Sequence, residues 1–384
     1  MIKKVGLLSC HFLNNYGTML QAYALQRKIS DLGYNVEYID YRFKDLVPTQ
    51  NKRLWIRIKR IPYYFFNFKY FFVKTIYSRK MSLRRDYFKD FYMKHIRVSQ
   101  KKYATSQELE KKPPEYDIYI IGSDQVWNPN LSYSSSVYFL DFVKNNRKKA
   151  SYAPSLGVTS FTSDQKKEIA KYIRQFKYLS CREMFGAKIL EKIVNRNVSH
   201  VLDPTLLIDK DLWEKMAVKP KITEPYILCY FLGDTKYPRE FVRQFENKTG
   251  IKAYYIPCSP LDMPKKTVIY EVGPAEFLGL IQNASYVCTD SFHGSVFSII
   301  FKRQFYSFCK KADTEKDSDN SRIKELMKFT GLETRLITLG QSVSEEESKI
   351  NYTLVESYIN PIKKRSEVYL LEILHSMRSN SYVV

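Results

Sequence analysis

The fold of this chain is decided near its N-terminus, where residues 5–39 read VGLLSCHFLNNYGTMLQAYALQRKISDLGYNVEYI. The apolar run 5–9 predicts a buried strand, and the helical spacing of apolar residues over 18–31 predicts a helix. A second apolar run at 36–39 predicts another strand. A strand, a helix and a strand in this order are typical of a parallel α/β unit, because parallel neighbours need a crossover connection.

The same alternation continues along the chain. The apolar run 117–121 predicts a central parallel strand, and further strands at 150–153, 178–181 and 199–202 alternate with helices. After a linker-like segment at 203–225, the pattern restarts at 226–231. The sequence therefore predicts an α/β protein of two Rossmann-like domains that face a cleft.

Domain boundaries follow from this restart. The predicted N-terminal domain takes residues 1–210, with a basic aromatic insertion at about 51–102, and the C-terminal domain takes residues 225–345. The amphipathic tail 346–384 is predicted to be helical and could cross back to brace the first domain. A length of 384 residues suits two domains of ordinary size.

Positive charge is concentrated in one stretch. The formal net charge is +22, and residues 52–102 hold 16 Lys and Arg against two acids, so this stretch contributes +14. Excess basic charge attracts any polyanion. The stretch matches no nucleic-acid-binding signature, so we expect no nucleic-acid partner. Docking on an anionic membrane surface and a helical cover over the first domain both remain open.

Targeting and metal signals are missing from the sequence. The first residues do not form a signal peptide, and no window reaches the roughly 18 apolar residues of a membrane-spanning helix. The six cysteines lack paired spacing, so we expect reduced thiols and no metal site. The pair Asp317 and Asp319 resembles a metal-binding D-x-D motif but is interpreted as a solvated loop. We expect a cytoplasmic protein, either soluble or peripheral at the inner face of the cell membrane.

The loop after the first predicted strand is polar and leads directly into a helix. Asn14, Asn15, Gly17 and Thr18 lie at that helix start, where free backbone N–H groups could hold an anion or a hydroxyl-rich ligand. The alternative is a tight turn in which Asn and Thr cap the helix.

The loop 122–129 reads GSDQVWNP and follows a predicted central strand, where ligands gather in open α/β sheets. Asp124 could position or deprotonate a sugar hydroxyl, with Ser123 and Gln125 beside it. Trp127 could stack on a sugar face. Its alternative is a buried indole that braces the loop.

Two further strand-to-helix bends carry candidate functional groups. Arg182 could converge with a helix N-terminus on one phosphate or carboxylate, and a salt bridge to Glu183 or another acid is equally compatible. His293 lies in the segment SFHGS, residues 291–295. A histidine on such a bend, with hydroxyls on both sides, can act as acid or base, although a single core histidine is usually structural.

Taken together, these motifs resemble those of the polysaccharide pyruvyltransferase family. The matches extend over about residues 4–340. They are the N-terminal strand with its Asn-Tyr-Gly loop and helix, GSDQVWNP at 122–129, Ser155-Leu156-Gly157, Arg182-Glu183, Asp203-Pro204-Thr205, Ser291-Phe292-His293-Gly294 and Asn320-Ser321-Arg322-Ile323. The resemblance implies a fold similar to that of the two-Rossmann (GT-B type) glycosyltransferases. It also implies a transferase that moves the pyruvyl group of phosphoenolpyruvate onto a hexose of a capsular, exopolysaccharide or cell-wall glycan, or its precursor, to form a cyclic ketal.

The resemblance also suggests roles for individual residues. Arg182 and His293 fall on the donor site, which we extend to Ser291, Gly294 and Ser295, with His293 as acid or base. Asp124 would orient the acceptor. The residues expected at the acceptor or in the surrounding loops are Asn14, Asn15, Gly17, Thr18, Ser123, Gln125, Trp127, Ser155, Asn320 and Arg322. Some relatives have Arg-Leu-His-Gly where this chain has Ser291-Phe292-His293-Gly294, which removes a cation expected to hold the donor.

A second function stays open on the same residues. A nucleotide-sugar-dependent glycosyltransferase of surface polysaccharide biosynthesis would use the same implied fold and a cleft histidine. In either case the expected partner is a glycan or lipid-linked oligosaccharide acceptor. No cofactor is expected beyond phosphoenolpyruvate as donor substrate. The sequence leaves open which sugar is modified and which oligomer forms.

Overall fold

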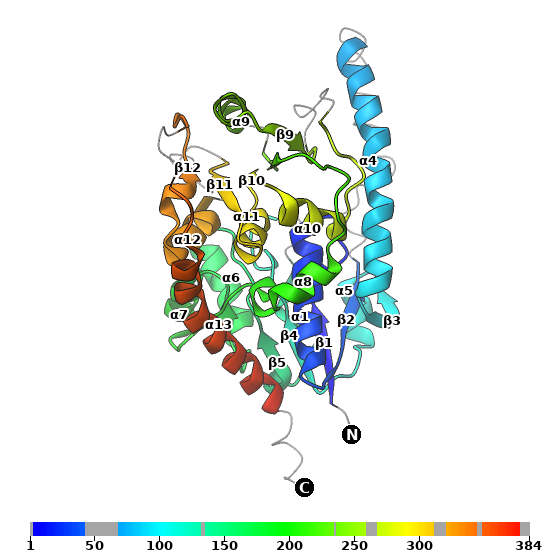
Figure 1. Cartoon of the computed structure of the whole chain (residues 1–384). Helices are drawn as coiled ribbons and strands as arrows, with labels where there is room; N and C mark the ends of the chain where they lie inside the picture. Colours follow the sequence, from blue (N-terminus) through cyan, green and yellow to red (C-terminus); the bar gives the residue numbers. More distant parts are fainter. Residues whose placement is uncertain are drawn as a thin grey trace.

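The structure is a computed structural model of the chain, and it describes residues 3–42, 68–131, 135–233, 236–258, 267–310, 320–343 and 348–376. Within α4, side chains are described for Lys80 and for residues 82–95. Two parallel β-sheets, one in each half of the chain, form the framework (Figure 1). The predicted α/β class is confirmed.

The first sheet has the strand order β3-β2-β1-β4-β5, with every pair parallel. The winding direction reverses between β1 and β4, and the crevice at such a reversal is where ligands bind in doubly wound sheets. The elements of this half are β1 (Lys4–Leu8), α1 (Tyr16–Asp31), β2 (Asn35–Tyr41), α4 (Phe68–His95), β3 (Val98–Tyr103), α5 (Ser106–Lys111), β4 (Ile118–Ile121), the 3₁₀ helices η2 (Ser136–Phe139) and η3 (Asn146–Lys148), β5 (Lys149–Ser151), α6 (Ser163–Ile173), β6 (Ser180–Cys181), α7 (Met184–Val194) and β7 (Ser199–His200).

The second sheet has the strand order β12-β11-β10-β8-β9, again with every pair parallel. Its winding reverses between β8 and β10, so the loop after β10 lies at the corresponding ligand-binding position. The remaining elements are η4 (Pro204–Leu207), α8 (Lys210–Met216), β8 (Tyr226–Tyr230), α9 (Tyr237–Thr249), β9 (Lys252–Tyr255), α10 (Pro274–Asn283), β10 (Tyr286–Thr289), α11 (Phe292–Ile300), β11 (Gln304–Phe308), α12 (Asn320–Thr330), η6 (Glu333–Arg335), β12 (Leu336–Ile337) and α13 (Tyr352–His375).

Two predicted strands of the first half do not join its main sheet. β6 and β7 form a separate two-stranded parallel sheet, shorter than the predicted strands at 178–181 and 199–202. A single bridge between Ala150 and Tyr178 is the pairing that links this small sheet to β5. The apolar runs correctly indicated buried segments, but burial alone does not create a long ladder of backbone hydrogen bonds.

Part of the predicted basic insertion is regular secondary structure of the first half. α4 is the crossover helix between β2 and β3, and β3 is an edge strand of the main sheet. The sequence pattern does not indicate β3, because Lys101 and Lys102 are exposed on it and interrupt the apolar run. Residues 51–67 of the predicted insertion lie outside the described part of the chain.

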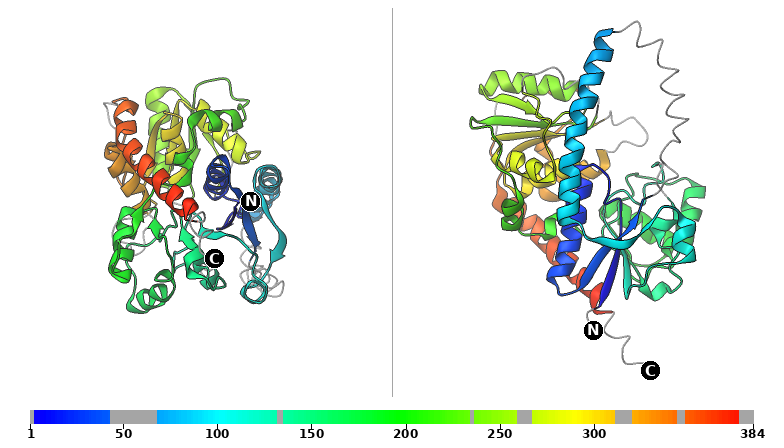
Figure 2. Two further views of the ribbon diagram at one scale, coloured as in Figure 1. Left: turned by 90° about the horizontal axis from the view of Figure 1, so that it is seen from below. Right: turned by 90° about the vertical axis from the view of Figure 1, so that its right-hand side faces the viewer.

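The lower part of α4 contacts both halves. Phe88 and Phe91 are buried in the hydrophobic core, and Arg84 Nη1 donates a hydrogen bond to the carbonyl of Pro257 at 2.8 Å. Figure 2 shows α4 running alongside both sheets. The part of α4 whose side chains are described therefore packs as a cover on both halves.

The predicted linker at 203–225 is partly folded and buried. It contains η4 and α8. The Trp213 side chain is fully buried, and its Nε1 donates a hydrogen bond to the carbonyl of Thr205 at 3.1 Å. The Asp-Pro start resembled a loop, but the apolar residues after it pack into the core. Residues 204–216 of the segment therefore belong to the folded core, and residues 217–225 carry no helix or strand.

The C-terminal helix α13 leaves the second half and reaches the first (Figure 1). Tyr369 Oη donates a hydrogen bond to the carbonyl of Ser151 at 3.0 Å, and Ser366 Oγ accepts one from the backbone N–H of Leu202 at 2.9 Å. Glu367 pairs with Lys28 at 2.6 Å. These contacts tie α13 to α1, to β5 and to the segment after β7.

Among the residues that the structure describes, no helix combines the length and the apolar character needed to cross a membrane.

Candidate active site

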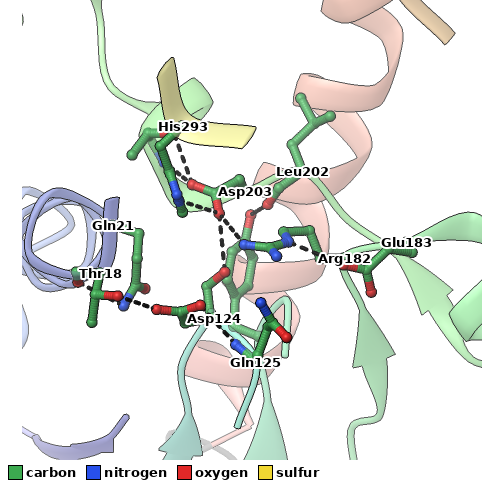
Figure 3. Close-up of polar contacts among 12 residues, drawn as sticks. Thr18, Gln21, Asp124, Gln125, Arg182, Glu183, Leu202, Asp203 and His293 are labelled. Atoms are coloured by element: carbon green, nitrogen blue, oxygen red, sulfur yellow. Dashed lines mark hydrogen bonds and ion pairs between the residues drawn. The ribbon is translucent and has the colours of Figure 1, made fainter. Parts of the chain in front are cut away.

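The candidate site lies where the loops after β1 and β4 meet the start of α11 (Figure 3). The parallel sheets deliver these loops at their carboxyl edges, so side chains far apart in the sequence converge. Thr18 and Asp124 come from the first half, and His293 comes from the second.

Asp203, which follows β7, contacts more of the side chains in this site than any other described residue. Its buried carboxylate oxygen Oδ2 accepts from Arg182 Nη1 at 2.9 Å and from Ser123 Oγ at 3.1 Å. The same oxygen lies 3.4 Å from His293 Nε2. Oδ1 accepts from the Thr205 hydroxyl at 2.7 Å and from its backbone N–H at 3.1 Å. Asp203 therefore connects both halves through one carboxylate.

These contacts keep Asp203 ionised. Burial by itself would raise the pKa of Asp203, but its interactions with His293, Arg182 and Thr205 together lower that pKa below the ordinary range. A buried carboxylate with three donors and a cation is stable in its charged form. The site thus contains a permanent negative charge beside the histidine.

Arg182 is buried between acids, as one of the two alternatives predicted. Its Nε pairs with Glu183 Oε1 at 3.3 Å, in addition to the contact with Asp203. Burial acts to lower the pKa of Arg182, but the charges of Glu183, Asp203 and Asp124 raise it above the ordinary value. Its guanidinium also lies 4.4 Å from the centre of the Phe292 ring. Nη2 is buried and has no hydrogen-bond partner among the described residues, so one donor remains for a ligand.

His293 packs directly against the first turn of α1. A methyl group at Gly17 would lie 1.9 Å from His293 Nδ1, so only glycine leaves room for the imidazole. Asn15 caps α1 by accepting from the Thr18 N–H at 3.1 Å, and Ser291 caps α11 by accepting from the Gly294 N–H at 3.3 Å. The starts of two helices therefore meet at His293. Their partial positive charges favour an anion at this place.

Asp124 is held in an uncommon backbone conformation. Its φ is +83°, a region that non-glycine residues rarely adopt. Its Oδ2 accepts a hydrogen bond from the Thr18 hydroxyl, and its Oδ1 accepts from the backbone N–H of Gln125 at 2.8 Å. Its carbonyl accepts from the backbone N–H of Ser155 at 2.8 Å. The loop thus directs this carboxylate toward the start of α1.

A contact between the halves forms at Gln125. With its amide oxygen turned toward α12, Gln125 accepts from Arg322 Nη1 at 2.9 Å and from Nη2 at 2.7 Å. Arg322 and Arg182 both line a small cavity of about 20 Å³ that also borders Phe292. Two guanidinium groups therefore face the same space.

The prediction that Trp127 stacks on a sugar is not supported. Its side chain is 1% exposed, its ring stacks on Phe139 with centroids 5.4 Å apart, and its Nε1 donates to the carbonyl of Tyr138 at 2.9 Å. The alternative, an indole that braces the loop, describes its position. An aromatic residue in a polar loop is buried here because η2 folds over it.

The other predicted residues lie at or near the site in different roles. The Ser295 hydroxyl is buried and bonded to Ser307 Oγ at 2.6 Å and to the Ser291 carbonyl at 3.1 Å, so its hydrogen bonds hold the start of α11 against β11. Asn320 accepts from the backbone N–H of Lys310 at 2.7 Å, within the second half. Asn14 is exposed. A glycine is needed at Gly294 because a methyl group there would lie 2.6 Å from Thr289 Oγ1.

Sequence analysis assigned no role to two polar residues of the site. Asp203 appeared only within a matching motif, because Asp before Pro is also typical of a turn. Gln21 is fully buried, and its Nε2 donates to the carbonyl of Thr18 at 2.9 Å. The sequence offered one signal for Gln21, which was its place on the helix face expected to pack inward. No group of three or more potential metal ligands occurs among the described residues.

Comparison with known proteins gives one family and several similar folds. Residues 15–308 match the family model described as polysaccharide pyruvyl transferase. A search of curated proteins found no match. Among solved structures, the chain is similar to MnaA of S. aureus in complex with UDP, with 8% identity, 96% of this chain and 90% of that chain covered, and a TM-score of 0.50.

Two glycosyltransferase structures are similar at lower scores. UGT89C1 of Arabidopsis thaliana, complexed with quercetin, shares 10% identity, with 100% of this chain and 96% of that chain covered and a TM-score of 0.45. The E. coli heptosyltransferase WaaC with ADP shares 10% identity, with 94% and 99% covered and a TM-score of 0.41. The likeness to MnaA concerns the fold alone, and it agrees with the predicted two-Rossmann architecture.

Proposed function

The chain belongs to the polysaccharide pyruvyl transferase family, whose model matches residues 15–308, and from this premise we propose that its donor is phosphoenolpyruvate. The acceptor is a hexose of a surface polysaccharide or its precursor. The product is a cyclic ketal across two hydroxyls of that sugar. The observation that supports this proposal best is the position of His293, beside the Asp203 carboxylate and at the meeting point of two helix starts.

The reaction consumes one donor and releases one phosphate. An acid protonates the methylene carbon of phosphoenolpyruvate, which becomes a methyl group and leaves a cationic carbon. One sugar hydroxyl attacks this carbon and loses its proton to a base. Phosphate then departs with the electron pair of its C–O bond, and the second hydroxyl attacks the same carbon. Each attacking hydroxyl releases one proton. These two protons balance the proton that was added to the methylene carbon and the proton that phosphate takes up.

His293 is the proposed acid and base. Asp203 lies 3.4 Å from Nε2 and can accept a hydrogen bond from it, which would orient the ring. Asp203 would thus act as a positioning residue and not as a proton carrier.

The anionic groups of the donor would be held by several positive groups. Arg182 Nη2 is buried without a partner among the described residues, and Arg322 lines the same small cavity. The N-termini of α1 and α11 add partial positive charge. Arg322 would supply a cation in place of the one that some relatives have at the position of Ser291. Asp124, held by Thr18, would orient an acceptor hydroxyl.

Substrate entry requires the halves to separate. The cavity beside Arg182, Phe292 and Arg322 has a volume of about 20 Å³, which is room for roughly one water molecule. Phosphoenolpyruvate is much larger. We therefore propose that the contacts between Gln125 and Arg322 and between His293 and Gly17 open when substrates bind, and that they close for the reaction.

The test uses purified protein with each candidate donor. With phosphoenolpyruvate and a panel of hexose-containing saccharides, we expect release of inorganic phosphate and a mass gain that corresponds to a ketal. Release of a nucleoside diphosphate from a nucleotide sugar, with no use of phosphoenolpyruvate, would instead support the glycosyltransferase alternative. Comparing the surface glycans of cells with and without the protein would identify the natural acceptor.

Docking on an anionic membrane surface is a further part of the proposal. Net charge of +14 over residues 52–102 supports it, and Met93 on α4 is 64% exposed. Much of this stretch lies outside the described side chains. If the protein ignores anionic vesicles at low salt, the membrane idea fails and α4 acts as a cover.

A further inference from the structure

A second pocket lies in the first half, apart from the His293 site. It has a volume of about 330 Å³ and lies between the segment around η2 and the helix α6. This volume falls in the range of small-molecule sites. The walls combine aromatic rings with a few polar groups, and this composition is typical of a binding pocket.

Three nearly parallel aromatic rings form one side of this pocket. Trp127 stacks on Phe139 with centroids 5.4 Å apart and planes 10° apart. Phe139 stacks on Tyr172 of α6 with centroids 5.2 Å apart and planes 18° apart. Tyr172 is the half-buried member, so it is the ring that a ligand would contact. Rigid aromatic surfaces of this kind suit the apolar C–H face of a sugar ring.

The charge of the lining indicates a neutral ligand. The chain carries +22, yet none of the described residues that line the pocket is a Lys or Arg, while Glu168 contributes a carboxylate. Lys171 lies 5.5 Å from the Tyr172 ring centre but is not part of the lining. A phosphate or an anionic lipid would meet the Glu168 carboxylate without a Lys or Arg among the described lining residues to offset it. Gln165, Ser135 and Ser136 can instead exchange hydrogen bonds with hydroxyl groups.

The pocket is close to the candidate active site along the chain. Trp127 follows Asp124 by three residues, so their Cα atoms lie within about 11 Å of each other. Gly157 packs closely against this loop, because a methyl group there would lie 2.3 Å from Asn128 Nδ2 and 2.4 Å from Gln125 Oε1. A short oligosaccharide can span such a distance.

We infer that this pocket binds a neutral hexose unit of the acceptor glycan, next to the sugar that receives the ketal. The identity of the occupant rests on the proposed function. Tyr172, backed by the buried rings of Phe139 and Trp127, would contact the sugar face, and Glu168 and Gln165 would accept and donate hydrogen bonds to its hydroxyls. The enzyme would therefore prefer oligosaccharide acceptors over single sugars.

The direct test measures saccharide binding without any donor. Saturation-transfer NMR titrations would use methyl β-lactoside, methyl β-cellobioside and methyl β-maltoside as probes. We expect the wild-type protein to bind at least one of them, Tyr172→Ala to weaken that binding by about tenfold, and Tyr172→Phe to restore it. The matched control is Tyr178→Ala, because Tyr178 lies in the same half and also has a lysine, Lys177, 5.0 Å from its ring centre.

Two binding results would overturn the inference. One is that the wild-type protein binds none of the three probes, and the other is that Tyr172→Ala binds them as tightly as the wild type. Binding that depends on Tyr172 in a protein that never uses phosphoenolpyruvate would refute the proposed reaction but leave the sugar pocket. If Tyr172→Ala forms the ketal on oligosaccharides at the normal rate and with unchanged KM, the sugar pocket is refuted but the proposed reaction stands.

Discussion

The carboxylate of Asp203 lies 3.4 Å from the imidazole Nε2 of His293. This contact joins the end of the first half to the first turn of α11 in the second. The same carboxylate oxygen also accepts from Arg182 at 2.9 Å. One buried acid thus contacts two of the residues that were expected at the donor site, Arg182 and His293.

Replacing the histidine tests the proposed chemistry. His293→Ala should lower turnover by about 10² to 10⁴, the range typical of a lost acid or base group. The fold should persist, which circular dichroism and the melting temperature can check. Near-normal turnover with either type of donor would make His293 a structural residue and move the acid–base role to Asp124 or elsewhere.

The positioning role of Asp203 predicts a split between binding and turnover. Asp203→Asn keeps the shape but removes the charge, so kcat should fall while KM for the acceptor changes little. Removing one partner of a buried ion pair also costs about 3–5 kcal/mol of stability. Assays must therefore run below the melting temperature of the variant. An unchanged kcat in folded Asp203→Asn would contradict this role.

The same residue predicts a pH dependence of stability. The pKa of Asp203 is lowered in the folded protein from its usual 3.8. Its stabilising contribution is therefore complete above about pH 4 and is lost as the pH falls toward the lowered value. Urea unfolding of wild type and Asp203→Asn should show a difference in unfolding free energy that shrinks below pH 4. A difference that stays constant down to pH 2 would rule this out.

Arginine and lysine should not be interchangeable at position 182. Arg182→Lys keeps the charge, but a single ammonium cannot contact Glu183 and Asp203 and also present a free donor as the planar guanidinium does. We expect KM for phosphoenolpyruvate to rise more than kcat falls. Steady-state kinetics at varied donor concentration provides the measurement. Equal donor use by the folded variant would place the donor elsewhere.

Close packing of Gly17 against His293 gives a test of the closed state. Alanine usually stabilises a helix relative to glycine by up to about 1 kcal/mol, yet here its methyl group would lie 1.9 Å from Nδ1 of His293. Gly17→Ala should therefore lower stability and turnover together. In a His293→Ala background the same change should be harmless or stabilising. If Gly17→Ala alone raises the melting temperature, the two residues are not in contact in solution.

The buried His11 predicts a second pH effect on stability. Burial lowers the pKa of His11 from 6.5 to about 4, so the unfolded chain takes up the proton first as the pH falls. Stability present above pH 6.5 should decline by about 3 kcal/mol by pH 4. His11→Phe, which keeps the stacking against Tyr38, should flatten that decline. Denaturant titrations measure the unfolding free energy of both proteins at each pH. If this free energy falls equally in both proteins as the pH is lowered, the assignment to His11 is contradicted.

Some elements could be predicted because their signal is local. The apolar runs of β1, β4 and β10 and the polar loops that follow them depend on neighbouring residues in the sequence. Polar groups at the ends of central parallel strands gather at one edge of the sheet, so Asp124 and His293 were expected in the cleft. β3 was missed because an edge strand exposes residues such as Lys101 and Lys102 and so lacks a continuous apolar pattern.

The sequence by itself determined the α/β class, the two parallel sheets and the loops that carry the candidate site, because hydrophobic periodicity and turn chemistry act over a few residues. Only the tertiary structure decided the partners of each polar group. Asp203 contacts Ser123, 80 positions away, and Trp127 is covered by η2 instead of facing a ligand. Such contacts depend on how whole layers pack. The energy of a buried charge is set by the groups that packing brings around it.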